Sequence, residues 1–303
     1  MAPQAKPAVS VICPERQEIA NRATEELTNT LAMLDIHDWK LPTVNIRFTE
    51  VDNIPPARVA AHGETVEVLF SKKCATPEGE KAFIAELGAN MAFPGVRQTL
   101  KHELAHIAMW SVTGLSRQPA VRLIDEGWAS MVEQLGSSKT PDLNVLSKET
   151  KTNIARGLKE EPMLYRRCLD LSKPVSQLDS KEELDRLNSA EYEVGKALLL
   201  WIRERFGNEK MLQLIAKSPQ SSRRNDAEGA PIEPTAIESS LHSTSKEYLE
   251  MFDRVTKGAL SGDKMIEEGR SWERLQFQRA LLETTGMTNI KEVEADFMKW
   301  LEE

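Results

Sequence analysis

The stretch TLKHELAHIAMW, residues 99–110, contains two histidines four positions apart with a glutamate directly after the first. Residues i and i+4 of an α-helix lie on one face, so His102 and His106 can offer imidazole nitrogens to a single metal ion. Glu103 is displaced by about 100° around the helix. Its carboxylate can reach a water on the open side of the metal without binding the ion, as a general base must. The spacing therefore predicts a metal-binding helix that carries its own base.

An amphipathic helix can also carry this spacing by chance. The chain has only 5 histidines among 303 residues, which makes a coincidence less frequent. Leu100, Leu104 and Ile107 give the helix an apolar back that leaves the histidines at the edge of a buried stripe. A third ligand decides the question, because a catalytic zinc has three protein ligands and one open position.

A candidate third ligand lies on the next amphipathic helix, predicted over residues 120–136 (AVRLIDEGWASMVEQLG). A short loop over 114–119 can fold this helix back against the first one and bring Glu126 to the histidines. Asp125 competes for the same role. The positions expected to face inward are Val121, Ile124, Trp128, Met131, Val132 and Leu135. They favour Glu126 only slightly, so both carboxylates stay open at this point.

The segments before the histidine helix mix helix and strand patterns. Apolar residues between Glu15 and Leu34 repeat at helical spacing, and residues 42–50 and 65–70 alternate as half-buried strands do. Both strands are expected in one sheet. A short helix is predicted over 77–88, ended by Gly88. This N-terminal lobe, residues 1–136, would contain the small mixed sheet and both site helices.

The rest of the chain, residues 137–303, has helical patterns only and is predicted to form an all-helical C-terminal lobe of the same catalytic unit. The expected helices cover roughly 143–158, 160–170, 180–187, 190–205, 208–217, 235–257, 264–284 and 289–302. The polar stretch 218–235, with three prolines and a glycine, is expected to be an exposed loop. The predicted fold class is α+β.

Composition excludes several classes of protein. A net charge of -8 argues against a protein that grips nucleic acid or an anionic membrane. No run of about 18 apolar residues is present, so no membrane span is expected. Cys13, Cys74 and Cys168 are odd in number and lack a CxxC pair, which indicates neither a disulfide framework nor a cysteine zinc site. The N-terminus shows no signal peptide, which fits a cytoplasmic protein or an exported one whose signal has been removed.

HELAH followed by DEGWASMVE resembles the gluzincin zinc metallopeptidases and is most similar to the peptidase-MA-like families. Residues 190–215 (AEYEVGKALLLWIRERFGNEKMLQLI) and 281–301 (LLETTGMTNIKEVEADFMKWL) are also similar to helices of those families. The resemblance implies a zincin-like metallopeptidase fold and one zinc ion per chain. By this resemblance His102, His106 and Glu126 bind the zinc, and Glu103 is the base in peptide-bond hydrolysis.

The resemblance also implies roles for two further residues. Glu133 would hold a histidine ligand in place, although a solvated surface carboxylate explains it equally well. Tyr192 would stabilise the oxyanion of the reaction, and its alternative role is to anchor its own helix by packing. His62 and His242 are further candidates for the oxyanion role.

The chain departs from the aminopeptidase-N-like pattern. Nineteen residues, 107–125, separate His106 from Glu126, one more than in those enzymes, and GANMA (88–92) lacks the glutamate with which they capture a substrate amino terminus. We therefore expect an endopeptidase for peptide or protein substrates. An extended substrate would pair with strand 65–70 if that strand is an edge. The alternative is a non-catalytic metallopeptidase-like module that binds peptides or proteins and retains a zinc site, against which the intact Glu103 argues.

Overall fold

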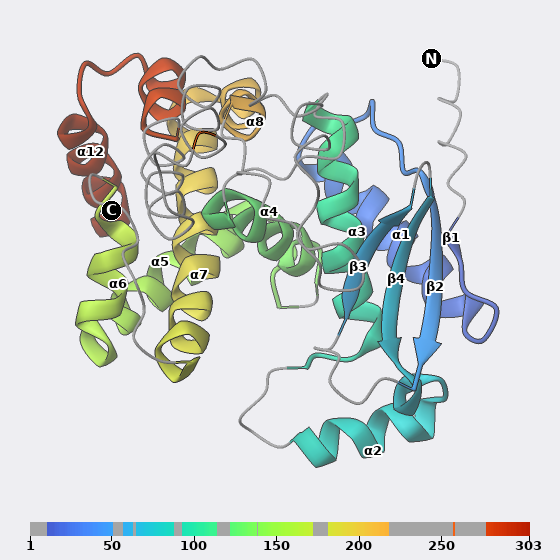
Figure 1. The fold of residues 1–303 in the computed structure, drawn as a ribbon. Helices are drawn as coiled ribbons and strands as arrows, with labels where there is room; N and C mark the ends of the chain where they lie inside the picture. The colour runs from blue at the N-terminus through green and yellow to red at the C-terminus, as the bar shows by residue number, and fades with distance from the viewer. Residues whose placement is uncertain are drawn as a thin grey trace.

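The structure, a computed structural model, describes residues 11–50, 57–62, 65–87, 93–113, 122–137, 139–171, 181–217, 257 and 277–303. These residues form one small sheet and a larger set of helices, so the predicted α+β class is confirmed (Figure 1). The predicted loop 114–119, loop 218–235, helix 235–257, the first part of helix 264–284, Gly88, Val121 and His242 lie outside the described residues. No helix within the described ranges is both long and apolar enough to cross a membrane.

The described sheet has the strand order β1 (Val11–Ile12), β2 (Thr43–Thr49), β4 (Thr65–Ser71) and β3 (Arg58–His62). β1, β2 and β4 are parallel, and β3 runs antiparallel to β4. The pairing of Val44 with Val66 and of Ile46 with Val68 places their side chains on the same face. The two strands expected from the sequence are thus confirmed as neighbours.

Two features of the sheet differ from the sequence prediction. Strand β4 was the candidate for pairing with a substrate if it formed an edge, but it pairs with β2 on one side and β3 on the other, so the edges of the described sheet are β1 and β3. Alternation of apolar and polar residues reports which face is buried, not a strand's place in the sheet. β1 and β3 were not predicted, because β1 has 2 residues and RVAAH in β3 has little alternation.

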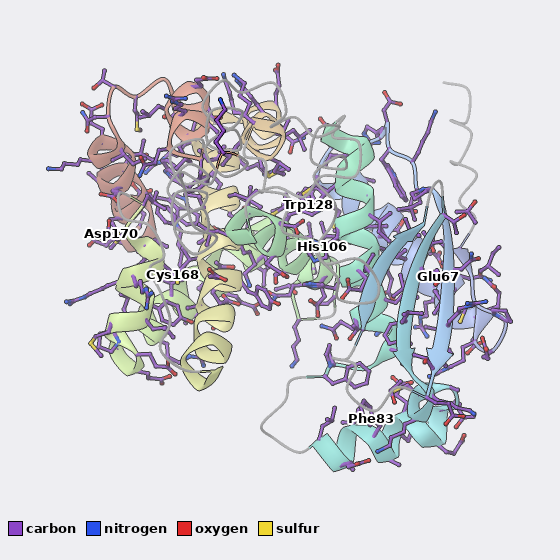
Figure 2. The ribbon with its side chains drawn as sticks, viewed as in Figure 1. Glu67, Phe83, His106, Trp128, Cys168 and Asp170 are labelled. Atoms are coloured by element: carbon purple, nitrogen blue, oxygen red, sulfur yellow. The ribbon has the colours of Figure 1, made fainter. Side chains whose placement is uncertain are left out.

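Helices α1 (Gln17–Met33) and α3 (Val96–Thr113) cover one face of the sheet, as Figure 1 shows. The fully buried residues on this side are Val44, Val66, Val68 and Phe70 of the sheet, Ala20, Ala23, Leu27 and Leu31 of α1, and Leu100, Leu104 and Ile107 of α3. Burying each larger aliphatic or aromatic side chain contributes about 1.5–3 kcal/mol. On the opposite face Arg47 forms an ion pair with Glu67 at 3.3 Å, and Glu67 is labelled in Figure 2.

The N-terminus of α3 is fixed by a glutamate of a neighbouring helix. α2 (Pro77–Leu87) follows a short 3-10 helix, η1 (Lys72–Cys74), and carries Glu80. Glu80 Oε1 accepts a hydrogen bond from the Val96 amide at 2.7 Å, one of the amides that a helix leaves without an internal partner. Arg16 forms an ion pair with the other oxygen of Glu80 and also donates to the Cys74 carbonyl at 3.1 Å. The start of the histidine helix is therefore anchored from two sides.

Helix α4 (Arg122–Gln134) lies between the sheet side and the remaining helices in Figure 1, and hydrogen bonds to backbone carbonyls join it to α3. Trp128 Nε1 donates to the Ala105 carbonyl at 2.9 Å. Lys101 Nζ donates to the carbonyls of Glu133 at 3.2 Å and Leu135 at 2.9 Å, at the C-terminal end of α4. These bonds hold the predicted ligand helix against the histidine helix.

The residues described in the C-terminal half form helices and short connections, as predicted. It contains α5 (Leu143–Glu160), α6 (Pro162–Leu169), α7 (Lys181–Phe206), α8 (Asn208–Lys217), helical residues 277–285, and α12 (Ile290–Glu302). The separation of 180–187 from 190–205 was wrong, because α7 is one helix. Asn188 and Ser189 are weak helix formers, but they do not break the backbone hydrogen bonding. α7 packs against α4, α5, α6, α8 and α12.

Candidate metal centre

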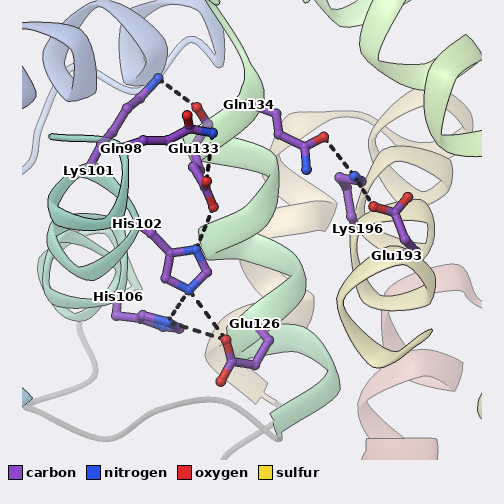
Figure 3. Close-up of polar contacts among 9 residues, drawn as sticks. All are labelled: Gln98, Lys101, His102, His106, Glu126, Glu133, Gln134, Glu193 and Lys196. Atoms are coloured by element: carbon purple, nitrogen blue, oxygen red, sulfur yellow. Dashed lines mark hydrogen bonds and ion pairs between the residues drawn. The ribbon is translucent and has the colours of Figure 1, made fainter. Parts of the chain in front are cut away.

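Helices α3 and α4 bring the three predicted ligands together, His102 and His106 from α3 and Glu126 from α4 (Figure 3). His102 Nε2 lies 3.2 Å from His106 Nε2 and 3.4 Å from Glu126 Oε2. His106 Nε2 lies 3.6 Å from the same oxygen. A tetrahedral zinc ion with bonds of about 2.0–2.1 Å separates its ligand atoms by about 3.3 Å. The three atoms have the spacing that such an ion needs, so this cluster can hold a metal ion.

The local sequence explains why these atoms converge. Leu104 and Ile107 of α3 are fully buried, and they turn the opposite edge of the helix, with both histidines, toward α4. Glu126 directly follows Asp125, which lies in the first turn of α4, where the helix dipole favours a negative charge. The two histidine side chains are each 14% exposed and that of Glu126 is 15% exposed. The three side chains are therefore mostly buried but remain partly accessible to solvent.

A carboxylate holds the other nitrogen of each imidazole. His102 Nδ1 lies 2.9 Å from Glu133 Oε2, and His106 Nδ1 lies 2.9 Å from Asp125 Oδ1. An ionised carboxylate only accepts hydrogen bonds, so each Nδ1 is the donor and each Nε2 can present its lone pair to a metal ion. Glu133 thus has the position that the resemblance implied.

The structure also separates the two carboxylates that the sequence left as alternatives. Glu126 joins the ligand cluster, whereas Asp125 contacts the opposite nitrogen of His106. The role of Asp125 as a histidine partner was not predicted. Its position next to Glu126 was the available signal, because a helix that aims one carboxylate at an imidazole can aim its neighbour at the same ring.

Gln98 extends this network and was also missed by the sequence. Its Nε2 donates to Glu133 Oε1 at 2.8 Å, while Glu133 Oε2 contacts His102 (Figure 3). Gln98 lies four residues before His102 on the same face of α3, and this spacing was the signal that could have identified it. Both oxygens of Glu133 are therefore occupied, which fixes the orientation of the His102 ring.

The carboxylates make both imidazoles strongly basic in the metal-free protein. Burial lowers the pKa of His102, but the hydrogen-bonded carboxylates of Glu126 and Glu133 outweigh it and raise the pKa to about 9. Burial likewise opposes protonation of His106, and the charge and hydrogen bond of Asp125 raise its pKa well above the usual 6.5. A positive ion at the two Nε2 atoms would therefore replace protons that the site already attracts.

Glu103 lies beside the cluster without joining it. The ligand group found among the described residues consists of His102, His106 and Glu126. Burial raises the pKa of the Glu103 carboxyl, while the positive charges of His106 and His102 oppose the rise. A carboxylate with a raised pKa next to a metal ligand is suited to accept a proton from a water near neutral pH.

A third helix, α7, contributes Tyr192 to the surroundings of the site. Its ring centroid lies 6.1 Å from that of His102, with an angle of 57° between the planes. Of the other candidates for the oxyanion role, His62 lies in the edge strand β3 and His242 is outside the described residues. The structure thus brings Tyr192, which the sequence singled out, beside one of the three candidate ligands.

Comparison with known proteins adds no relative: no protein-family model, curated protein or solved structure matches the chain. The function must therefore be inferred from the chemistry of the site. The site provides two imidazole nitrogens and a carboxylate oxygen at metal-binding distances, a half-buried carboxylate at their side, and the ring of a tyrosine nearby.

Proposed function

We propose that the protein is a zinc-dependent peptidase with a zincin-like fold, of the gluzincin type and closest to the peptidase-MA-like families. The convergence of His102 Nε2, His106 Nε2 and Glu126 Oε2 carries this proposal. Two histidines and one glutamate form a ligand set of catalytic zinc sites, as in thermolysin, whereas structural zinc sites use four protein ligands. Three ligands in the described cluster leave a coordination position for a water.

The general base is Glu103. A bound zinc ion would lower the pKa of water toward neutrality and polarise the carbonyl of the scissile bond. Glu103 takes the proton of the attacking water and then passes it to the leaving amine. Its raised pKa brings it closer to the operating pH, which improves both proton transfers. Asp125 and Glu133 keep the histidine rings in the orientation in which Nε2 faces the cluster.

Tyr192 is the candidate donor to the oxyanion. Hydrolysis of an amide places negative charge on the former carbonyl oxygen, and a hydrogen-bond donor already in position stabilises that charge. The Tyr192 ring lies beside His102, and the side chain is half-buried, so the ring is near the ligand cluster and partly shielded from bulk water. Its replacement by phenylalanine should reduce turnover without affecting zinc content.

The sheet suggests how an extended substrate is held. Strand β4 is not an edge of the described sheet, whereas β3 is one of its two edges, with β4 as its described partner. In Figure 1 this edge is on the same side of the sheet as α4. An extended peptide that adds to such an edge is held by main-chain hydrogen bonds and needs no free terminus. This supports an endopeptidase acting on peptide or protein substrates.

Zinc content and cleavage of a peptide library test the proposal in the wild type and in Glu103→Gln. We expect about one zinc per chain in both proteins and a loss of cleavage of at least about 10²-fold in the variant, the usual contribution of a general base. Glu149→Gln, which removes an exposed carboxylate of α5, is the matched control. Stoichiometric zinc without cleavage in any of them would identify a binding module, and absence of zinc from the wild type would overturn the metal site itself.

A further inference from the structure

Helices α4 and α7 cross with their backbones in direct contact. A Cβ on Gly127 would lie 2.3 Å from the Gly195 carbonyl carbon, and a Cβ on Gly195 would lie 1.8 Å from the Leu123 oxygen. Both distances are shorter than any real contact, so only glycine fits on either side of the crossing. The crossing lies next to the metal ligand Glu126 on α4 and three residues after Tyr192 on α7. Any slide or rotation there changes how the two side chains approach each other.

A buried lysine bonds the two helices beside this crossing. Lys196 is 0% exposed, and its Nζ donates to Gln134 Oε1 on α4 at 2.8 Å and to Glu193 Oε1 on α7 at 2.8 Å (Figure 3). Glu193 Oε2 in turn accepts from Asn153 Nδ2 on α5 at 3.3 Å. The described contacts of Lys196 thus connect α7 to α4 and, through Glu193, to α5.

Lys196 and Tyr192 are four residues apart, so both lie on the face of α7 that meets α4 and the histidine helix. On α4, Gln134 directly follows Glu133, whose carboxylate holds His102. The bond from Lys196 to Gln134 therefore ties the Tyr192 helix to the residue next to the one that orients the His102 ring. The path from one ring to the other runs through two hydrogen bonds and short stretches of helix.

We propose that Lys196, through its hydrogen bond to Gln134, is a positioning residue that sets the register of α7 on α4 and thereby holds the Tyr192 ring against His102. An apolar residue of similar size would fill the same space at less cost, because taking a charged pair out of water is unfavourable. It would not, however, tie α7 to one residue of α4, as the 2.8 Å hydrogen bond from Nζ to Gln134 Oε1 does. An effect of Lys196 on catalysis rests on the proposed function. Its effect on the position of Tyr192 is independent of that function.

The placement can be measured without activity or metal. The chain has 3 tyrosines, so protein labelled with 3-fluorotyrosine gives a simple ¹⁹F NMR spectrum, and Tyr192→Phe assigns the resonance. In the metal-free wild type, His102→Ala should shift the Tyr192 resonance because the neighbouring ring is lost. In the Gln134→Leu background, and in Lys196→Met, we expect most of this shift to disappear and the Tyr192 line to broaden.

Two further variants make the test specific. Gln134→Glu keeps an acceptor for Lys196 and should restore the full shift. Lys151→Met removes a lysine that lies over the Trp300 ring at 4.1 Å, away from α4, and should leave the Tyr192 resonance unchanged. Gln134→Leu decides the outcome if Lys196→Met does not fold, because Lys196 then still has Glu193.

A full Tyr192 response to His102→Ala in folded Gln134→Leu would overturn the proposal, whatever the protein's activity. If the wild type cleaves peptides, Gln134→Leu should also lower kcat with KM and zinc content unchanged. If the wild type neither binds zinc nor cleaves, the proposed function fails while the metal-free spectra still decide the role of Lys196.

Discussion

Asp125 and His106 are joined by a contact of 2.9 Å between Oδ1 and Nδ1, and the next residue of the same helix, Glu126, places Oε2 at 3.6 Å from the other nitrogen of that ring. Two consecutive carboxylates of α4 therefore reach opposite sides of one imidazole. Because both belong to one turn of helix, the orientation of the ring and the position of the third ligand are coupled. A change in Asp125 should act on the metal without any direct bond to it.

We expect Asp125→Asn to bind zinc about 10–100-fold more weakly than the wild type, the usual effect of removing the partner of a metal-bound histidine. The amide still offers an oxygen to Nδ1, but the negative charge that favours the ring's basicity is gone. Competition with a chromophoric chelator measures the affinity.

Asp38→Asn, which changes an exposed aspartate far along the chain from either site helix, is the control for a general effect of charge. Glu133→Gln should weaken binding to a similar extent, because Glu133 serves His102 in the same way. Equal zinc affinity in wild type and Asp125→Asn would show that the contact with His106 has no influence on the metal.

The sequence predicted those parts of the fold that depend on local periodicity. α1, α3, α4 and strands β2 and β4 occur where apolar spacing placed them, because one face of each is buried. Strand β3 has no such pattern, and the order of strands depends on pairing between distant segments. Whether residues 65–70 form an edge was accordingly left open by the sequence, and the structure places that strand between β2 and β3.

In the candidate site, too, the sequence predicted what depends on local spacing and not what depends on helix packing. His102, Glu103 and His106 lie within one turn and a half of helix, so their spacing was readable from five letters. Glu126 was only a favoured alternative, because its approach depends on how α4 folds back on α3. The partnership of Asp125 with His106 arises entirely from that packing, and nothing in the local pattern distinguished it from a second ligand.

Metal binding should release protons. The pKa of His102 is raised to about 9, so that ring carries an extra proton at pH 7 in the metal-free protein, and the pKa of His106 is raised in the same direction. A metal ion at the two Nε2 atoms displaces the proton of His102 at that pH and competes with protonation of His106. Affinity must then fall as the pH is lowered and keep rising with pH until about 9, where His102 loses its proton by itself.

Calorimetric titration with zinc in buffers of different ionisation enthalpy counts these protons. In Asp125→Asn the count should be smaller, because the carboxylate that raises the pKa of His106 is absent. Binding that is independent of pH between 7 and 8.5 would contradict protonated imidazoles at this site.

The crossing of α4 and α7 should not tolerate a single added methyl group. Gly195→Ala would place a Cβ 1.8 Å from the Leu123 oxygen, and a backbone atom cannot rotate away as a side chain can. We expect a loss of about 3 kcal/mol in the free energy of unfolding, at the upper end for overpacked cores. Urea denaturation followed by circular dichroism measures it.

Gly207→Ala provides the comparison. Gly207, between α7 and α8, has a φ of 94° but nothing within 4 Å of an added Cβ, so its cost is limited to backbone strain of about 1–2 kcal/mol. Equal losses at the two positions would mean that the helices separate easily and that close contact at Gly195 is not required.

Lys101 should give the protein a characteristic dependence of stability on alkaline pH. Its Nζ donates to the Glu133 and Leu135 carbonyls at the end of α4, and burial lowers its pKa from 10.5 to about 8. Between these two pH values Lys101 is protonated in the unfolded chain but not in the folded protein. Its contribution to the free energy of unfolding therefore increases with pH from about 8 to about 10.5. Below pH 8 both states are protonated and the buried charge opposes folding by a constant amount.

Lys101→Met isolates this contribution, because the histidines titrate equally in both proteins. The free energy of unfolding of the wild type relative to the variant should increase by about 3 kcal/mol over that range, which corresponds to the size of the pKa shift. Urea denaturation at a series of pH values from 7 to 10.5 gives the difference. A difference that stays flat would mean that Lys101 keeps its proton in the folded protein and that α4 is capped by a fully charged side chain throughout.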